Sequence, residues 1–541
     1  MSNSSSQVSR QDKIPNENWI LVATILPSSM GFIAGTALNI ALPALQQELG
    51  ALASDVIWIV NAYTLLLSAL ILLGGSLGDR LGRKRVFMVG IAIFTVTSFL
   101  CGFANSVGLL IALRLLQGIG GALMVPGSLA ILSVAFPPNQ RGRAVGTWST
   151  FSAIVTVLGA PLGGLLAGLG QWRLVFFINV PLGILALFVL NRYVSESKDE
   201  TTPPQLDYLG ALLIVLALAG LTYGFTELPN LGFSALAIQF ALVGGVVAFL
   251  LFMVWEARTQ HPLVPLKLFR SKTFTGTNLL TLLIYATIGV FPVLLPLNII
   301  QVQGYPEAIA GLVTLPFGIV LALMGRFSGQ LLDRIGSRIP LVLGSAITGI
   351  GYVLLAANGL TTGPDSYWGT FFPAIMALGL GMGFIVAPLT TTVMNAAPSE
   401  AVGTASGINN AVARIAGVLA LAVFGAVTLT LFSNSLQERV TELGVSAEIH
   451  AAVMGQAAQL AEATPPPNVP PDTAAAIAAS IKGAFIDAFQ FVMLMMAVLC
   501  WFGGVMGLLL VESREVLLSK HQAVPIRADS SVEEGQFNQV E

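Results

Sequence analysis

The sequence has very little charge for its length. Of its 541 residues only 10% are charged, whereas 55% are hydrophobic. A soluble chain carries roughly a quarter of its residues as charges, so most of this surface must meet something other than water. Long stretches contain no charged residue at all, among them 18–47, 56–78, 208–226 and 488–511. Because about 20 apolar residues cross a hydrocarbon layer of about 30 Å, these stretches predict membrane spans.

Cysteine and histidine are also scarce. The two cysteines, Cys101 and Cys500, lie in apolar runs far apart, which excludes a disulfide framework. The three histidines, His261, His450 and His521, lie outside the predicted spans. A membrane-embedded enzyme would need histidines, acids or cysteines gathered at one depth, and a primary pump would need a phosphate-cradling glycine loop. We therefore predict no enzyme, no cofactor, no metal and no nucleic-acid partner.

The apolar runs predict an all-α integral membrane protein with fourteen spans. We place them at 19–43, 56–76, 86–105, 107–130, 147–169, 174–191, 208–226, 236–255, 273–300, 308–331, 339–357, 367–392, 403–431 and 487–511. With both termini in the cytoplasm, cytoplasmic segments hold most of the 25 lysines and arginines. The outer segments then hold only Arg173, Arg439 and Lys482. This asymmetry follows the positive-inside rule and supports that orientation.

One loop sequence occurs twice. Residues 75–84, Gly-Ser-Leu-Gly-Asp-Arg-Leu-Gly-Arg-Lys, return in related form at 329–338, again after an even-numbered span. Related halves around a midplane cavity are typical of secondary transporters. We predict a cytoplasmic tail, an N-terminal six-helix half, two inserted helices with their flanking loops, a C-terminal six-helix half and a second cytoplasmic tail, at 1–18, 19–192, 193–272, 273–512 and 513–541. We expect the outer loop, 433–482, to form short amphipathic helices over the outer face.

The first copy of the repeated loop combines glycines with one acid and several bases. It is either a tight turn with positive-inside charge or a latch. In a latch, Asp79 pairs with Arg83 or with a helix end, and the contact opens as the halves rock. The repeat favours a cytoplasmic latch, with Gly75, Asp79, Arg80, Gly82, Arg83, Lys84, Asp333 and Arg334 as its residues.

Polar side chains interrupt several spans. An arginine in lipid, such as Arg114, is costly unless it faces protein or water, which points to function. The structural alternative is an arginine bonded to backbone carbonyls. Amides in other spans are explained equally well by hydrogen bonds between helices, but Arg414, about 17 Å into its span, is explained less well.

These motifs resemble the major facilitator superfamily, in its fourteen-helix drug:proton antiporter branch. The loop at 75–84 is similar to the signature between its second and third helices. Arg114-x-x-Gln117-Gly118 resembles the fourth-helix motif linked to proton coupling. Gly159, Pro161, Gly163 and Gly164 match the fifth-helix antiporter motif, although close helix packing would also explain these small residues.

The resemblance implies export of amphipathic small molecules across a bacterial-type inner membrane. It implies alternating access with inward proton flow, by a monomer in the lipid bilayer. The candidate cavity residues are Thr36, Asn39, Trp58, Asn61, Tyr63, Asn298, Gln301, Asn409, Asn410 and Arg414. An exporter of an endogenous amphiphile, such as a lipid, fatty acid or siderophore, is the alternative. A channel is less favoured, since it would not need duplicated latches.

One position departs from the family pattern. The first helix of the family reads Asp-x-Thr-x-x-Asn-x-Ala-Leu-Pro, and here Ala34 replaces the acid, while Thr36 and Asn39 are kept. By helical rise Ala34 and Arg114 lie level, about 8–10 Å below the outer membrane edge. Coupling therefore uses another group, or Ala34 is a substitution that removes the protonation site and leaves a coupling-deficient protein. Without that acid, Arg114 and Arg414 would favour anionic or polar-headed substrates.

Overall fold

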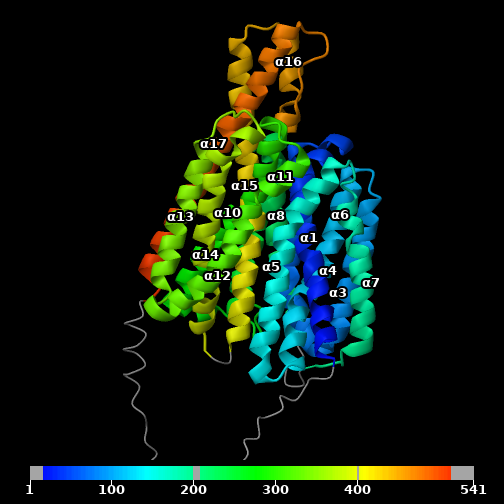
Figure 1. Cartoon of the computed structure of the whole chain (residues 1–541), viewed down its shortest axis with the longest axis vertical. Helices are drawn as coiled ribbons and strands as arrows, with labels where there is room; N and C mark the ends of the chain where they lie inside the picture. The colour runs from blue at the N-terminus through cyan, green and yellow to red at the C-terminus, as the bar shows by residue number, and fades with distance from the viewer. Residues whose placement is uncertain (1–15, 199–206, 399–400, 513–541) are drawn as a thin grey trace, which may run out of the picture.

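The computed structural model describes residues 16–198, 207–398 and 401–512, and within these ranges it contains helices but no strands. Figure 1 shows them as one upright bundle. The helices of the first part are α1 (Glu17–Leu49), α2 (Ala53–Leu81), α3 (Arg83–Gly102), α4 (Val107–Ala135), α5 (Pro138–Gly168), α6 (Leu174–Phe177), α7 (Asn179–Tyr193), α8 (Tyr208–Leu231) and α9 (Leu236–Arg258). The second part contains η1 (Leu266–Arg270), α10 (Lys272–Leu297), η2 (Asn298–Val302), α11 (Glu307–Val313), α12 (Leu315–Ile335), α13 (Arg338–Ala356), η3 (Pro364–Gly369), α14 (Phe371–Asn395), α15 (Val402–Glu442), α16 (Ala447–Met454), η5 (Ala457–Glu462) and α17 (Pro471–Leu510).

The bundle has two distinct ends. Helix α1 begins and α17 ends at what we call the lower end, at the bottom of Figure 1, whereas α16 stands at the upper end. Among the described residues, thirteen helices are long and apolar enough to cross a membrane. The remaining predicted span falls on α5, which has 31 residues and a shorter apolar part, Ile154–Gly168. The predicted fold class is therefore confirmed, and the predicted count of fourteen agrees to within one helix.

Two predicted spans are broken by prolines. The sixth divides between α6 and α7 at Ile178, and the tenth divides between α11 and α12 at Thr314. Pro181 and Pro316 follow these breaks closely. Proline cannot donate to the carbonyl four residues earlier, so each interrupts its helix.

The outer segment differs from the prediction. Instead of only short helices lying over the face, α15 runs for 41 residues and α17 for 40, and both continue beyond the bundle. Figure 1 shows these extensions standing above the upper end together with α16. The Ala-rich stretch 473–479 favours helix strongly, which explains why α17 starts so far from the bundle.

Contacts between helices fall into three groups. Helices α1 to α7 pack mainly on one another, and so do α10 and α12 to α17, whereas α11 packs mainly on α5 and α8 packs on α9. Helix α8 also contacts α2 and α15, so the inserted pair touches both larger groups. The two larger groups meet through α2 with α15, α5 with α11, and α1 with α10. The space that remains between these contacts is where a cavity can form.

Candidate transport cavity

A cavity of about 1230 Å³ lies between the two larger helix groups. It follows α2 from Val60 down to Asp79, a stretch of about 28 Å at the rise of an α-helix. Helix α15 faces it with Thr404, Gly407 and Arg414. The described lining continues to the lower end through 260–263, in the connection after α9. The cavity therefore reaches from the middle of the bundle to its lower end.

The upper end is closed by contacts between the two groups. On α1, residues 40–43 above the cavity are buried, and so are Leu45 and Gln46. The Gln46 amide accepts a hydrogen bond from Gln301 Nε2 at 3.2 Å and donates one to the Gln459 carbonyl oxygen at 3.2 Å. Gln459 belongs to η5, so the outer segment contributes directly to this closure.

Glycines of α5 allow the closest approach at the upper end. A β-carbon on Gly164 would overlap the Glu307 carbonyl oxygen and lie 3.0 Å from Gly311 Cα of α11. One on Gly163 would overlap the backbone of Ala37 in α1, and one on Gly159 would overlap Thr36. These three glycines thus allow α5 to pack against α1 and α11 at once. Pro161 forms part of the same contact, since its Cα lies 3.1 Å from the β-carbon position of Gly311.

Arg114 is buried beside the cavity and bonded to the protein on two of its nitrogens. Only 1% of it is exposed. Its Nε donates to the Ile59 carbonyl oxygen at 3.1 Å, and one terminal nitrogen donates to Gln117 Oε1 at 2.7 Å. Its guanidinium also lies 4.6 Å from the centre of the Tyr63 ring. The bond to the Ile59 carbonyl is the one expected of an arginine with a structural role. Arg114 nevertheless also lines the cavity.

Arg414 is more open to the cavity. Its Nε donates to Asn410 Oδ1 at 3.1 Å, one helical turn away. No described carboxylate pairs with it. Both residues line the cavity, so its middle presents a cation with unfilled donors.

Ala34 is buried, with 1% exposed, in the same apolar cluster as Tyr63 and Met124. Its neighbours Gly35 and Thr36 line the cavity, but Ala34 is outside the lining. A carboxylate at position 34 would therefore start from the packed face of α1 toward the Tyr63 side, not from the cavity wall.

The candidate cavity residues separate into two sets. Thr36, Asn39, Tyr63, Asn410 and Arg414 line the cavity. The others are engaged in hydrogen bonds with the protein. Four of them join helices to one another: Trp58 donates to Glu227 on α8, Asn61 to the Val418 carbonyl on α15, Gln301 to Gln46, and Asn409 to Asn278 and Thr281 on α10. The bond of Asn298, which accepts from Gln303, is local to η2.

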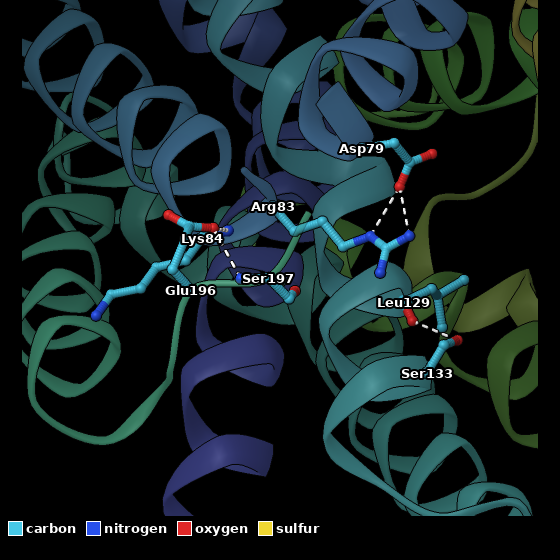
Figure 2. A network of polar contacts seen from close by, with 7 residues as sticks. All are labelled: Asp79, Arg83, Lys84, Leu129, Ser133, Glu196 and Ser197. Carbon is cyan, nitrogen blue, oxygen red and sulfur yellow. Dashed lines mark hydrogen bonds and ion pairs between the residues drawn. The ribbon is translucent and has the colours of Figure 1, made fainter. Parts of the chain in front are cut away.

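The repeated loop lies at the lower end of the cavity. Figure 2 shows the polar contacts of its first copy. Asp79 Oδ1 accepts from Arg83 Nε at 2.7 Å and forms an ion pair with its terminal nitrogen at 2.7 Å. The backbone N–H groups of Lys84 and Arg85 donate to the Glu196 carboxylate at 3.0 and 3.1 Å, so this acid caps the start of α3.

Gly82 makes this arrangement possible. Its φ is +114°, and a β-carbon there would lie 2.7 Å from the Glu196 carboxylate. Gly75 lines the cavity. Arg80 closes the last turn of α2. The side chains of Asp333 and Arg334 lie outside the described part of the structure.

Sequence reasoning missed two acids at the lower end. Asp207, which lines the cavity, and Glu256 are buried, although both lie near helix ends. Two other acids near helix ends have partners: Glu227 accepts from Trp58, and Asp487 pairs with Arg439 at 2.8 Å. The sequence did contain a signal for this pairing. Only four residues join α8 to α9, so the two helices are antiparallel neighbours, and the start of α8 lies beside the end of α9.

Comparisons with known proteins agree with this architecture. The sequence matches the profile of the Major Facilitator Superfamily over residues 26–421. Multidrug resistance protein Stp of Mycobacterium tuberculosis is 32% identical over 425 residues, 77% of each chain. The tetracenomycin C resistance and export protein of Streptomyces glaucescens is 32% identical over 475 residues, 86% of each chain.

A solved structure shows the same fold. It is a bacterial homologue of the human lysosomal transporter Spinster in an inward-facing, unoccupied conformation. It aligns with a TM-score of 0.61 at 17% identity, covering 92% of this chain and 98% of that one. Together with the helical bundle and its cavity, the profile match shows that this chain is a multi-pass membrane transporter, not an enzyme, and that it belongs to the Major Facilitator Superfamily.

Proposed function

We propose that this transporter exports amphipathic small molecules from the cytoplasm, exchanging them for protons by alternating access. The observation that carries the proposal is the cavity of about 1230 Å³, closed above by α1, α5, α10 and α11 and continuing to the lower end. Its lining mixes apolar side chains with hydroxyls and amides; Arg114 and Arg414 line its middle, and Asp79, Arg83 and Asp207 line its lower end. Such a surface suits ligands with an apolar body and a polar or anionic head. The names of the two relatives, a multidrug resistance protein and an antibiotic exporter, support the same substrate class.

Efflux of a fluorescent dye by the purified protein in liposomes tests this function. A dye with an apolar body and an anionic head should be released from liposomes that contain the protein and retained by liposomes that lack it. An endogenous amphiphile, such as a lipid, fatty acid or siderophore, remains the second candidate, because the same cavity would admit it. Competition by extracted membrane lipids for dye efflux would favour that candidate.

We place the lower end in the cytoplasm of a bacterial-type inner membrane, because the basic residues gather there. A cysteine replacing exposed Glu442 should then react with an impermeant maleimide in whole cells, and one replacing exposed Lys267 should not. Native Cys101 and Cys500 are buried and give little background. The reverse labelling pattern would show that the lower end faces outward, and the cavity seen here would then take up substrate from outside the cell, which contradicts the proposed export.

We propose that the loop at 75–84 is a latch whose Asp79–Arg83 pair stabilises one conformational state. Asp79→Asn should slow efflux by up to about fivefold, because a partly exposed ion pair contributes up to about 1 kcal/mol. Initial efflux rates at matched expression measure this. Asp55→Asn, an acid at the opposite end of the same helix, is the matched control. Equal rates for Asp79→Asn and wild type would reduce the loop to a topological signal.

Ala34 is the position at which a coupling carboxylate can be added. Ala34→Asp should raise the stimulation of efflux by a pH gradient several-fold over wild type, because it places an ionisable group on the Tyr63 side of α1, near Arg114. Ala34→Asn has the same size without the charge and should leave the stimulation low. The same response in both variants would mean that the coupling proton binds elsewhere.

A further inference from the structure

Two carboxyl groups that the transport motifs leave unexplained lie together at the lower end. Asp207 precedes α8, and Glu256 lies in the last turn of α9. They are 7% and 3% exposed and are the only buried acids among the described residues. Because α8 and α9 are the inserted helices, this pair has no equivalent in the repeated motifs of the larger groups.

Each carboxyl group has one oxygen held by donors. Asp207 Oδ1 accepts from the Gly210 backbone N–H and from Trp255 Nε1, both at 2.7 Å. Glu256 Oε2 accepts from the Val264 backbone N–H at 2.9 Å. These bonds fix the orientation of both groups and leave the second oxygen of each to find another partner.

The second oxygens face one another without a donor. Asp207 Oδ2 and Glu256 Oε1 are buried and have no hydrogen-bond partner. The β-carbon position of Gly210 lies 2.5 Å from the first and 2.7 Å from the second, and the two carboxyl groups are within hydrogen-bond reach. Two acceptors can share a hydrogen bond only when one of them carries a proton. Two buried negative charges this close would repel strongly, as in other paired carboxylates that share one proton.

We propose that Asp207 and Glu256 form a proton-binding site at the cytoplasmic mouth of the cavity, with one proton shared between Asp207 Oδ2 and Glu256 Oε1. Among the described residues, no lysine, arginine or histidine side chain forms an ion pair with either carboxyl group. The other charged and titratable groups at the lower ends of the packed helices and in the connection after α9 form no hydrogen bond or ion pair with either carboxyl group. These groups are Tyr208 on α8, Arg258 on α9, Asp79 and Arg80 on α2, Arg414 on α15, and His261, Lys267 and Arg270.

The site is connected to the cavity on two sides. Asp207 itself lines the cavity, and Glu256 holds Val264, whose neighbours Leu263 and Pro265 also line it. Loss of the proton would drive the two carboxylates apart and shift the 260–265 segment. Protonation thereby favours the mouth geometry seen here, and this link to transport rests on the proposed export function.

Infrared spectroscopy of the full-length protein in liposomes tests the site without requiring transport. Wild type should show the carbonyl stretch of a protonated carboxyl group at neutral pH. Asp207→Asn and Glu256→Gln should both lose it, because each amide supplies the missing donor and leaves the other acid ionised. The same amides keep the acceptor oxygens for Gly210 and Val264, so both variants should fold. Asp487→Asn, which removes an acid paired with Arg439, should keep the band.

Efflux measured across a range of cytoplasmic-side pH gives the second readout. Wild type should change rate several-fold, and both variants should give a flattened profile. Two results would overturn the proton site. One is a carboxyl band that persists in both variants. The other is a wild-type protein that shows no carboxyl band and whose carboxylate bands shift when Na⁺ is added. If wild type shows the band, both variants lose it, and no probe is exported, the proton site would stand and the export function would be rejected.

Discussion

A Gly164→Ala variant should lose most of its export while remaining folded and inserted. The new β-carbon would overlap the Glu307 carbonyl oxygen and lie 3.0 Å from Gly311 Cα, both backbone atoms that cannot rotate away. Overpacking of this kind costs about 1–3 kcal/mol. Because the contact exists only when the upper end is closed, the cost falls on one state and shifts the equilibrium by about 5- to 150-fold. Initial efflux rates at matched expression would show the loss.

Gly168→Ala is the matched control. It lies one turn further along α5, and its β-carbon would be 3.4 Å from Ala308 N and 3.5 Å from Ala308 Cβ, which is ordinary contact. This variant should export at close to the wild-type rate. If the two variants export equally, close packing of α5 on α11 has no part in closing the upper end.

Arg414→Ala should weaken binding of anionic-headed substrates by about 10- to 150-fold. The guanidinium faces the cavity with only its Nε engaged, so its terminal nitrogens are free to meet an anionic group. Hydrogen bonds to charged groups contribute about 1.5–3 kcal/mol, which gives the expected range. Binding of a fluorescent anionic amphiphile to purified protein, titrated for wild type and variant, measures the change.

Two comparisons separate substrate recognition from folding. Arg414→Lys keeps the charge but loses the planar fork, so its affinity should fall between wild type and Arg414→Ala. A neutral-headed analogue should bind wild type and Arg414→Ala alike. Equal losses for the neutral and anionic ligands would show that Arg414 supports the fold. Arg114→Ala should weaken binding of the neutral and the anionic ligand equally, because Arg114 is buried and bonded to the Ile59 carbonyl and Gln117.

Hydropathy was sufficient to predict the helical membrane fold. Uncharged stretches of span length, such as 56–78, became buried or lipid-facing helices almost where expected. The extensions of α15 and α17 were missed because hydropathy detects only the part of a helix in lipid. The Ala-rich sequence before Lys482 nonetheless carried a helix signal in its propensity.

The cavity lining was harder to predict, because it depends on how each helix is rotated. Asn409 and Asn410 are adjacent in the sequence and point about 100° apart on α15. Asn409 binds Asn278 and Thr281 on α10, whereas Asn410 lines the cavity and accepts from Arg414. In a helix surrounded by lipid and protein, both faces are apolar, so sequence periodicity does not distinguish them.

The carboxyl pair shows a different limit. Asp207 and Glu256 are 49 positions apart, and each alone reads as an ordinary acid at a helix end. Only the pairing of α8 with α9 brings their second oxygens together. Burial then changes their chemistry, since both are withdrawn from the water that would normally solvate acids near a helix end.

The most direct test of the central claim is efflux driven by an imposed proton gradient. Purified wild-type protein would be reconstituted in liposomes loaded with an anionic amphipathic dye. Protein orientation would be scored with the Glu442 and Lys267 cysteine variants. When the compartment facing the upper end of the protein is acidified, dye should leave the compartment facing the lower end faster than it does without a pH gradient. A protonophore should abolish this difference. Equal rates with and without the gradient, in a preparation that binds the dye, would contradict proton-driven export.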